Sequence, residues 1–306
     1  MATTDNTAFS TLAQISDLLR DEPLKKYTSF KIGGPADLLA LPNDKQELQR
    51  LLKKAVELKI PVTLFGGGTN LLVSDNGIRG LVIITRQLTS EIGMTQTDSH
   101  KKTICVAAGD RLSTVCRFAI NHSLSGLEFA AGVPGTIGGA IMMNAGTPSG
   151  EMSGIVDAIK VLDRKTVAFK TIEKKDLNFS YRKLDLTDII VGATLTLKKA
   201  SLEKIAKNFE QTLQQKNTTQ PVSVASAGCF FKNPVSGKSA GELIDQAGLK
   251  GAKINDAMVS QSHANFIVNI NNATCKDILL LKQHVQEIVF NKFHIKLETE
   301  VRVEGE

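Results

Sequence analysis

Three consecutive glycines interrupt an apolar run at residues 64–72, whose sequence is LFGGGTNLL. Glycine has no Cβ, so three in a row allow positive φ angles and bring several backbone N–H groups close to a phosphate. Leu71 stands where a dinucleotide fingerprint needs a third glycine, and the pattern is not a Walker A loop. The segment alone therefore predicts a turn between strands, and it favours neither an ordinary turn nor an anion site.

A second glycine-rich segment changes that balance. Residues 126–150 contain seven glycines, around the sequence AAGVPGTIGGA at 130–140 and the tripeptide NAG at 144–146. So many small residues in a semi-apolar stretch indicate close approach of the backbone to a large, flat cofactor. Tight packing of a helix or strand is the alternative explanation of the same pattern.

The composition excludes several classes of protein. With 306 residues, 42% hydrophobic and 22% charged, the chain is long enough for two or three folded domains. No apolar run is long enough to span a membrane, and the polar N-terminus does not resemble a signal peptide, so we expect a cytoplasmic protein without membrane partners. The four cysteines and five histidines lack metal-ligand spacing, so we expect no metal.

The net charge of +6 would suit nucleic acid, but the chain has no tryptophan and only two tyrosines. We therefore expect no nucleic-acid partner, and instead solvated lysines with some positive charge lining a cleft for phosphorylated small molecules.

Periodicity divides the chain into three parts, residues 1–85, 86–200 and 201–306. The first part is predicted to contain a helix over 9–20, a helix capped by Asp44 with Glu47 three residues on, and strands at 62–65 and 81–85. The second part is predicted to contain a polar connection at 91–102, a strand at 104–108, a helix opened by Gly109 and Asp110, and strands at 155–162, 167–171 and 189–197.

The third part is predicted to start with a helix from Ser201. It should then contain a helix with the capping box Ser239 and Glu242, a strand at 266–270, a helix capped by Thr274, and a strand at 295–303 with alternating apolar and charged residues.

Individual polar residues give weak indications of chemistry. Arg182 follows Tyr181 at a strand entrance, where an arginine is usually a surface ion-pair partner but can also hold a carboxylate. Cys229, in the segment AGCFFKNP, is by itself more typical of buried packing. Nothing in the alternation of the last strand singles out Glu300.

Five motifs occur together in the order GGGTNLL, AGVPGTIGGA with NAG, YR, AGCFFKNP and LETEVRVEG. In this order they resemble the UDP-N-acetylmuramate dehydrogenase family, the UDP-N-acetylenolpyruvoylglucosamine reductases of bacterial cell-wall synthesis. The resemblance covers roughly residues 25–304. The short chain is similar to the subtype that lacks an inserted tyrosine loop over the substrate.

The resemblance implies an α+β fold. Residues 1–85 and 86–200 would be two subdomains of an FAD-binding domain of the p-cresol methylhydroxylase type, and residues 201–306 an α+β substrate-binding domain. It also implies an FAD- and NADPH-dependent oxidoreductase that acts on a UDP-sugar in peptidoglycan synthesis, and so in cell shape and cell division. We expect a monomer.

The same resemblance implies roles for particular residues. Arg182, Cys229 and Glu300 match the catalytic positions, and Tyr181, Lys232 and Asn233 match positions that contact substrate. The FAD-binding positions would be Gly66, Gly67, Gly68, Thr69, Asn70, Leu71, Gly132, Val133, Pro134, Gly135, Thr136, Gly138, Gly139 and Ala140. Cys229 departs from the family, many members of which carry serine there.

These roles agree with the chemistry of the implied reaction. Hydride addition to an enolpyruvyl ether leaves negative charge beside a carboxylate, which Arg182 can grip and Glu300, if protonated, can stabilise by a hydrogen bond. A thiol with an ordinary pKa near ~8.5 is mostly protonated at neutral pH, so Cys229 can then supply the proton.

Two other functions remain open on the sequence. One is a flavin oxidase of an alcohol or hydroxy acid, although neither glycine-rich segment contains the histidine or cysteine that often attaches FAD in such enzymes. The other is a flavin- or nucleotide-binding module without turnover, which would leave the AGCFFKNP segment unexplained.

Overall fold

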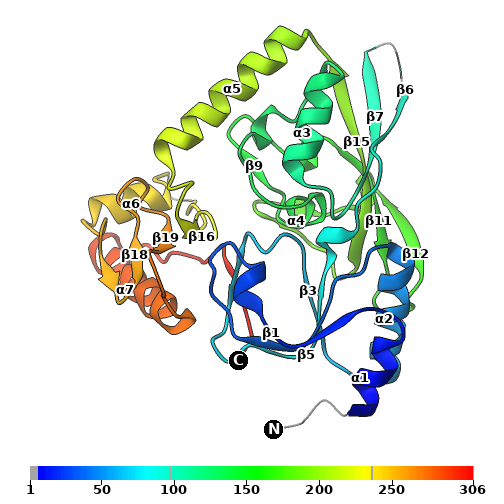
Figure 1. Cartoon of the computed structure of the whole chain (residues 1–306). Helices are drawn as coiled ribbons and strands as arrows, with labels where there is room; N and C mark the ends of the chain where they lie inside the picture. Colours follow the sequence, from blue (N-terminus) through cyan, green and yellow to red (C-terminus); the bar gives the residue numbers. More distant parts are fainter. Residues whose placement is uncertain (1–5, 97, 99, 236, 306) are drawn as a thin grey trace. The chain divides into compact units, whose positions relative to one another are not determined.

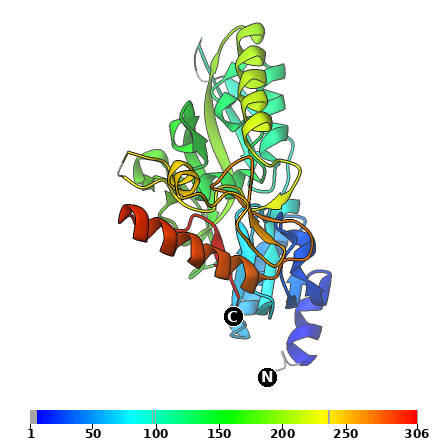
Figure 2. The same ribbon diagram turned by 90° about the vertical axis from the view of Figure 1, so that its left-hand side faces the viewer.

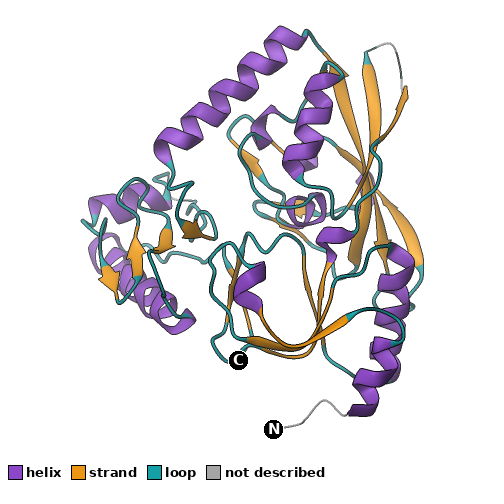
Figure 3. Cartoon of the chain, in the orientation of Figure 1, coloured by secondary structure: helices purple, strands orange, loops and turns teal. Residues whose placement is uncertain are grey.

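The computed structural model describes residues 6–96, 98, 100–235 and 237–305. The described chain contains helices together with long runs of consecutive strands, which confirms the predicted α+β class (Figure 3). The chain divides into two compact units. Unit 1 comprises Met1–Leu19, Leu38–Gly67 and Gly80–Gln215, and unit 2 comprises Arg20–Asp37, Gly68–Arg79 and Lys216–Glu306. The boundaries predicted at residues 85 and 200 stay a prediction.

The chain changes unit within four elements and inside the GGGTN turn. These elements are β1 (Leu18–Pro23), β2 (Pro35–Ala40), β5 (Ile78–Ile84) and α5 (Leu202–Thr219). The turn changes unit between Gly67 and Gly68, so Gly66 and Gly67 belong to unit 1 and residues 68–71 belong to unit 2.

One core of unit 1 forms around α2 (Lys45–Glu57), which packs with α1 (Asn6–Ala13). The Asp44 carboxylate accepts a hydrogen bond from the Glu47 N–H at 2.8 Å, so the predicted N-cap is confirmed. Leu48, Leu51 and Leu52 of α2 are buried with Leu81 and Ile83 of β5. Strand β3 (Val62–Phe65) runs parallel to β5 and leads directly into the glycine turn.

The larger core of unit 1 lies on a six-stranded sheet in the order β12-β11-β15-β7-β6, with a short strand β8 also pairing with β15. Helices α3 (Leu112–Asn121) and α4 (Ile137–Met142) lie on one side of this sheet (Figure 1). The strands are β6 (Gly93–Gln96), β7 (Lys101–Ala107), β8 (Leu124–Ser125), β11 (Val156–Leu162), β12 (Phe169–Glu173) and β15 (Ile189–Lys199), all paired antiparallel.

Two predictions in unit 1 are wrong. The helix predicted over 9–20 ends at Ala13, where the N–H groups of Ile15 and Ser16 both bond to the Leu12 carbonyl, and Leu18 begins β1. The polar connection predicted at 91–102 is largely a hairpin of β6 and β7, with Thr97 and Ser99 outside the described residues. Gly93, Met94 and Thr95 of β6 are all exposed, so this strand shows no alternation of buried and exposed residues.

Unit 2 is built on an antiparallel four-stranded sheet in the order β16-β19-β18-β17. Helices α6 (Ala240–Gln246) and α7 (Cys275–Phe293) pack together, and α7 packs against β17 and β18. Figure 2 shows α7 as the long helix coloured orange to red. The strands are β16 (Ala225–Ser226), β17 (Lys253–Ile254), β18 (Ala257–Val259) and β19 (Ile267–Asn269).

Both caps predicted for these helices are confirmed. Ser239 and Glu242 form a capping box at α6, and Thr274 caps α7 with Asp277 as its reciprocal partner. The last predicted strand is only partly formed, because regular pairing covers β20 (Arg302–Glu304) alone, parallel to β4 (Leu71–Val73). Val303, predicted on the apolar face, is 44% exposed.

Several short elements complete the described chain. The strands are β9 (Gly146–Thr147), β10 (Gly150–Glu151), β13 (Phe179–Ser180) and β14 (Lys183–Leu184), and the 3₁₀ helices are Leu24–Tyr27, Thr85–Gln87, Glu128–Ala130, Met152–Gly154 and Lys174–Asp176.

Candidate active site

The two glycine-rich segments meet in unit 1. A Cβ placed on Gly67 would lie 3.0 Å from the Gly135 Cα, and a Cβ on Gly66 would lie 2.8 Å from the Thr136 Oγ1. Only residues without side chains allow the two backbones to approach this closely. The two segments therefore pack backbone against backbone, and we call this contact the cradle. A flat ligand beside it would meet backbone and not side chains.

Thr136 adds a polar group to this cradle. It is the N-cap residue of α4 but makes no side-chain capping bond, and it is 4% exposed. Its Oγ1 has no hydrogen-bond partner among the described residues. A buried hydroxyl without a partner carries a free-energy cost, so Thr136 fits a site where a ligand supplies the missing bond.

Not every glycine of this segment faces such a site. A Cβ on Gly138 would lie 3.0 Å from the Ala108 Cβ and 3.2 Å from the Ala108 carbonyl oxygen. The Gly138 N–H also bonds to that carbonyl, at 2.8 Å. At Gly138 the small residue therefore serves the packing of α4 against the end of β7.

Asp110 supports the cradle in a way that the sequence did not reveal. It was expected to open a helix, but α3 begins at Leu112, and the Asp110 carboxylate instead accepts bonds from the Ala107 and Ser90 N–H groups. Its own carbonyl accepts the Ile137 N–H at 2.9 Å. Burial raises the pKa of the Asp110 carboxyl above its usual range.

The rest of the GGGTN turn belongs to unit 2 and is tied to the C-terminal strand. Gly68 has a φ of +66°, and its carbonyl accepts the Ser29 N–H at 3.0 Å. The Asn70 side-chain amide donates to the Glu300 carbonyl at 3.2 Å, and the Arg302 N–H donates to the Asn70 carbonyl at 3.1 Å. Asn70, predicted to bind the cofactor, thus also holds the backbone of Glu300.

Cys229 and Glu300 come from neighbouring segments of unit 2. The Glu300 N–H donates to the Phe230 carbonyl at 2.9 Å, and Phe231 forms a β-bridge with Thr299. The residue after Cys229 is therefore bonded directly to Glu300. The side chains of Cys229 and Glu300 are partly exposed, whereas that of Phe230 is fully buried.

Lys232 and Asn233 follow in the same segment. The Lys232 N–H bonds to the Glu298 carbonyl at 2.8 Å, and its ammonium lies 3.6 Å from the Glu298 carboxylate. The Asn233 Oδ1 accepts the Ala240 N–H at 3.0 Å, at the start of α6. Asn233 is thus already used in part to connect the segment to that helix.

Arg182 and Tyr181 lie in unit 1, at the two-residue tip of the β13–β14 hairpin. Arg182 has a φ of +58°, a conformation that costs about 1–2 kcal/mol for a residue with a long side chain. The Arg182 Nη1 donates to the Gly146 carbonyl at 2.8 Å, and the guanidinium carbon lies 5.2 Å from the centre of the Tyr181 ring.

Asn144, the first residue of the NAG motif, fixes this hairpin. It is 1% exposed, and its side-chain amide donates to the Ser180 carbonyl at 3.1 Å while its Oδ1 accepts the Ser153 N–H at 2.9 Å. The NAG motif therefore supports the arginine through both Asn144 and Gly146. The sequence showed the motif but not which segment it holds.

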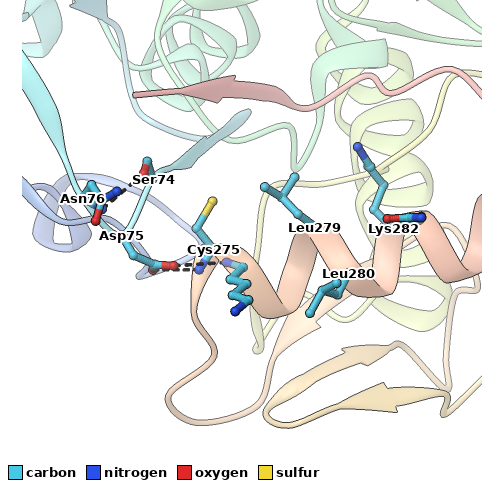
Figure 4. A pocket seen from close by; sticks show the side chains of 9 residues that line it. Ser74, Asp75, Asn76, Cys275, Leu279, Leu280 and Lys282 are labelled. Carbon is cyan, nitrogen blue, oxygen red and sulfur yellow. Dashed lines mark hydrogen bonds between the residues drawn. The ribbon is translucent and has the colours of Figure 1, made fainter. Parts of the chain in front are cut away.

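A separate hollow of about 470 Å³ lies in unit 2 beside the start of α7 (Figure 4). The Asp75 carboxylate bonds there to the N–H groups of Cys275 and Lys276 at 2.8 and 3.1 Å. None of the predicted site residues lines it. Within the described residues there is no group of histidine, cysteine and acidic side chains that could hold a metal ion, and no helix is long and apolar enough to cross a membrane.

Comparison with known proteins defines the class first. Residues 36–167 match the family model of an FAD binding domain, a range that includes both glycine-rich segments. The close glycine contact and the buried Thr136 hydroxyl fit such a cofactor. The protein therefore has an FAD-binding domain of the p-cresol methylhydroxylase type.

The particular family follows from the C-terminal part and from the whole chain. Residues 220–304 match the model of the UDP-N-acetylenolpyruvoylglucosamine reductase C-terminal domain. Two curated proteins of that name, from Caldanaerobacter subterraneus subsp. tengcongensis and Levilactobacillus brevis, are 42% and 43% identical, each over 94% of this chain and over 94% and 93% of their own lengths. The chain belongs to the UDP-N-acetylenolpyruvoylglucosamine reductase family.

A solved structure supports the same assignment. The UDP-N-acetylenolpyruvylglucosamine reductase of Thermus caldophilus is 36% identical, with a TM-score of 0.79 over 95% of this chain and 99% of that chain. The likeness therefore extends over both units of the fold.

Proposed function

We propose that this protein uses NADPH to reduce the enolpyruvyl group of UDP-N-acetylglucosamine enolpyruvate, giving UDP-N-acetylmuramate for peptidoglycan. Membership of the family supports this reaction, as does the order of the five motifs. FAD, when bound, would carry hydride from NADPH to the methylene carbon of the substrate. The FAD would be held by the four residues that form the cradle described above, Gly66, Gly67, Gly135 and Thr136.

The observation that carries the proposal is the direct pairing of the Cys229 and Glu300 segments through Phe230. The pairing holds the proposed proton donor, Cys229, and the acidic residue Glu300 on backbone segments that are bonded to each other. In the proposed reaction Glu300 in its protonated form donates a hydrogen bond to the developing enolate. The Cys229 thiol then forms the new C–H bond by giving its proton to the adjacent carbon, and the thiolate is reprotonated by solvent.

Arg182 would act on the carboxylate of the same enolpyruvyl group. A guanidinium binds a carboxylate with two parallel hydrogen bonds, which fixes the direction of the reacting double bond. The support from Gly146 and the positive φ of Arg182 are typical of a side chain held for function at some cost in stability. Tyr181, Lys232 and Asn233 would contact the rest of the UDP-sugar.

The wider predictions belong to this proposal. Residues 1–85 and 86–200 would form the FAD-binding part and residues 201–306 the substrate-binding part. The enzyme would act in the cytoplasm as a monomer, without nucleic-acid or membrane partners.

Replacing Cys229 tests the proposed chemistry. Cys229→Ser should keep substantial activity, because a hydroxyl fits the same space and can also give a proton. In Cys229→Ala, NADPH should reduce the flavin at the normal rate. Reoxidation of the flavin by substrate should be ~10²-fold slower, as expected for loss of a positioned general acid. Stopped-flow absorbance separates the two steps.

A packing role for Cys229 predicts the opposite order. Alanine would then behave at least as well as serine, because a partly buried hydroxyl needs a hydrogen-bond partner and a methyl group does not. Equal reoxidation rates for the serine and alanine variants would also reject the proton-donor role. Cys116→Ala is the matched control, since Cys116 is 1% exposed in the core of unit 1 and should affect stability alone.

A further inference from the structure

Asn265 binds the segment that follows Cys229 from the side opposite to Glu300. Its Oδ1 accepts the Phe231 N–H at 2.9 Å, and its Nδ2 donates to the Phe231 carbonyl at 2.8 Å. Its own carbonyl accepts the Phe230 N–H at 2.7 Å. One residue thus satisfies both polar groups of Phe231 and the N–H of Phe230, as a neighbouring strand would.

The same short segment is bonded to the C-terminal residues on its other edge. The Phe230 carbonyl accepts the Glu300 N–H, and the Lys232 N–H donates to the Glu298 carbonyl. Phe230 and Phe231 are 0% and 1% exposed, so this backbone cannot exchange its partners for water. Without Asn265, two buried polar groups of Phe231 would be left without bonds.

Asn265 is itself rigidly held. It is 4% exposed, and its N–H donates to the His263 Nδ1 at 3.2 Å. Burial lowers the pKa of His263, which favours the neutral ring that can accept this bond. The side-chain amide has its oxygen toward the Phe231 N–H and its nitrogen toward the Phe231 carbonyl, which is the orientation in which both bonds form.

We propose that Asn265 is a positioning residue that fixes the Cys229 thiol relative to Glu300. This inference rests on the proposed function, because it assigns Asn265 to the proton-transfer step. Asn265 does not touch the reacting atoms. It acts by holding the Phe230–Phe231 backbone against the Glu300 segment. The distance between the Cys229 thiol and the Glu300 carboxyl group is thereby kept fixed.

The test compares Asn265→Ala with Asn269→Ala. Asn269 lies four residues on, in the same unit, and is 5% exposed. Its side chain makes three hydrogen bonds, with Asn271, Ala273 and Phe30, and none with the Cys229 or Glu300 segments. The control thus removes an equally buried asparagine amide, and both variants should lose stability.

Of the two alanine variants, Asn265→Ala alone should slow the reoxidation of the flavin by substrate, by about 10²-fold, as expected when a reacting group moves by about 1 Å. Flavin reduction by NADPH should remain at the wild-type rate in both variants. Asn265→Asp is a second variant of the same shape. It keeps an acceptor for the Phe231 N–H but faces the Phe231 carbonyl with a second oxygen, so it should also slow reoxidation.

A second readout does not depend on activity. In a Cys105→Ser background, which removes the exposed cysteine, the rate of Cys229 alkylation by iodoacetamide is followed by peptide mass spectrometry. Asn265→Ala should change this rate at least several-fold, whereas Asn269→Ala should leave it unchanged.

Equal reoxidation and alkylation rates in the two alanine variants would overturn the inference. Failure of both Asn265 variants to fold beside a folded Asn269→Ala would also overturn it, because the role of Asn265 would then be in folding. If Cys229→Ala itself reoxidises normally, the proposed function fails instead. A slow Cys229→Ala with a normal Asn265→Ala rejects only the positioning role.

Discussion

At the scale of single residues, the buried hydroxyl of Thr136 allows a direct test of the proposed cofactor site. Its hydroxyl has no partner among the described residues, so Thr136→Val should leave the free energy of unfolding of the apoprotein unchanged or slightly higher. The same change should weaken FAD binding by about tenfold, since a hydrogen bond to a ligand is typically worth ~1 kcal/mol or more. Fluorescence titration of apoprotein with FAD measures this affinity.

Thr85→Val is the matched control for that experiment. Thr85 is 6% exposed, and its hydroxyl donates to the Phe65 carbonyl at 3.0 Å, so this change should lower apoprotein stability by about 1 kcal/mol. An unchanged FAD affinity in Thr136→Val would mean that the Thr136 hydroxyl does not serve the cofactor.

The catalytic candidates differ in how far the sequence could identify them. The family resemblance pointed to Arg182, Cys229 and Glu300. The residues by themselves favoured a surface ion pair for Arg182 and buried packing for Cys229, and did not single out Glu300. The sequence placed Asp110 at a helix start and Asn144 in the NAG motif, but it did not show which backbone groups they bind, and it did not single out Asn265. A buried asparagine or aspartate that satisfies another segment leaves no periodic pattern.

At the scale of elements, local signals predicted helix starts well. The caps at Asp44, Ser239 and Thr274 depend on residues three positions apart, so they are visible in a single sequence. The strand predicted over 295–303 failed in part because its pairing depends on segments far away, at residues 71–73 and near Phe231. Alternation of apolar residues cannot show whether a partner strand is present.

Helix α7 carries a testable dependence of stability on pH. Desolvation at its first residue raises the pKa of Cys275 from 9.0 to about 11, and the nearby Asp75 carboxylate adds to this shift. The thiol of the unfolded chain therefore ionises at lower pH than that of the folded protein. Its contribution to the free energy of unfolding is fully present below about pH 9 and is lost as the pH rises toward 11.

Comparison of the wild type with Cys275→Ala isolates this effect from other groups that titrate in the same range. The stability advantage of the wild type, measured by urea unfolding, should be constant up to about pH 9 and then decrease toward pH 11, the interval set by the two pKa values. A constant difference between the two proteins would show that Cys275 is not desolvated in solution.

At the scale of the whole molecule, the proposed reaction has two steps, and the residues proposed for them come from different parts of the chain. The glycine cradle and Arg182 belong to unit 1, while Cys229 and Glu300 belong to unit 2. In the proposed function, flavin reduction by NADPH does not use Arg182, Cys229 or Glu300, whereas reduction of the enolpyruvyl substrate uses all three. The reaction should therefore separate into two half-reactions with different residue requirements.

An anaerobic two-step experiment on the purified protein tests this account most directly. NADPH is added first, and UDP-N-acetylglucosamine enolpyruvate second, while the visible flavin absorbance is followed. We predict that NADPH bleaches the flavin and that the substrate then restores its colour, with one UDP-N-acetylmuramate formed per flavin reoxidised. A reduced flavin that stays bleached with the substrate but recovers its colour with oxygen would contradict the account and favour an oxidase.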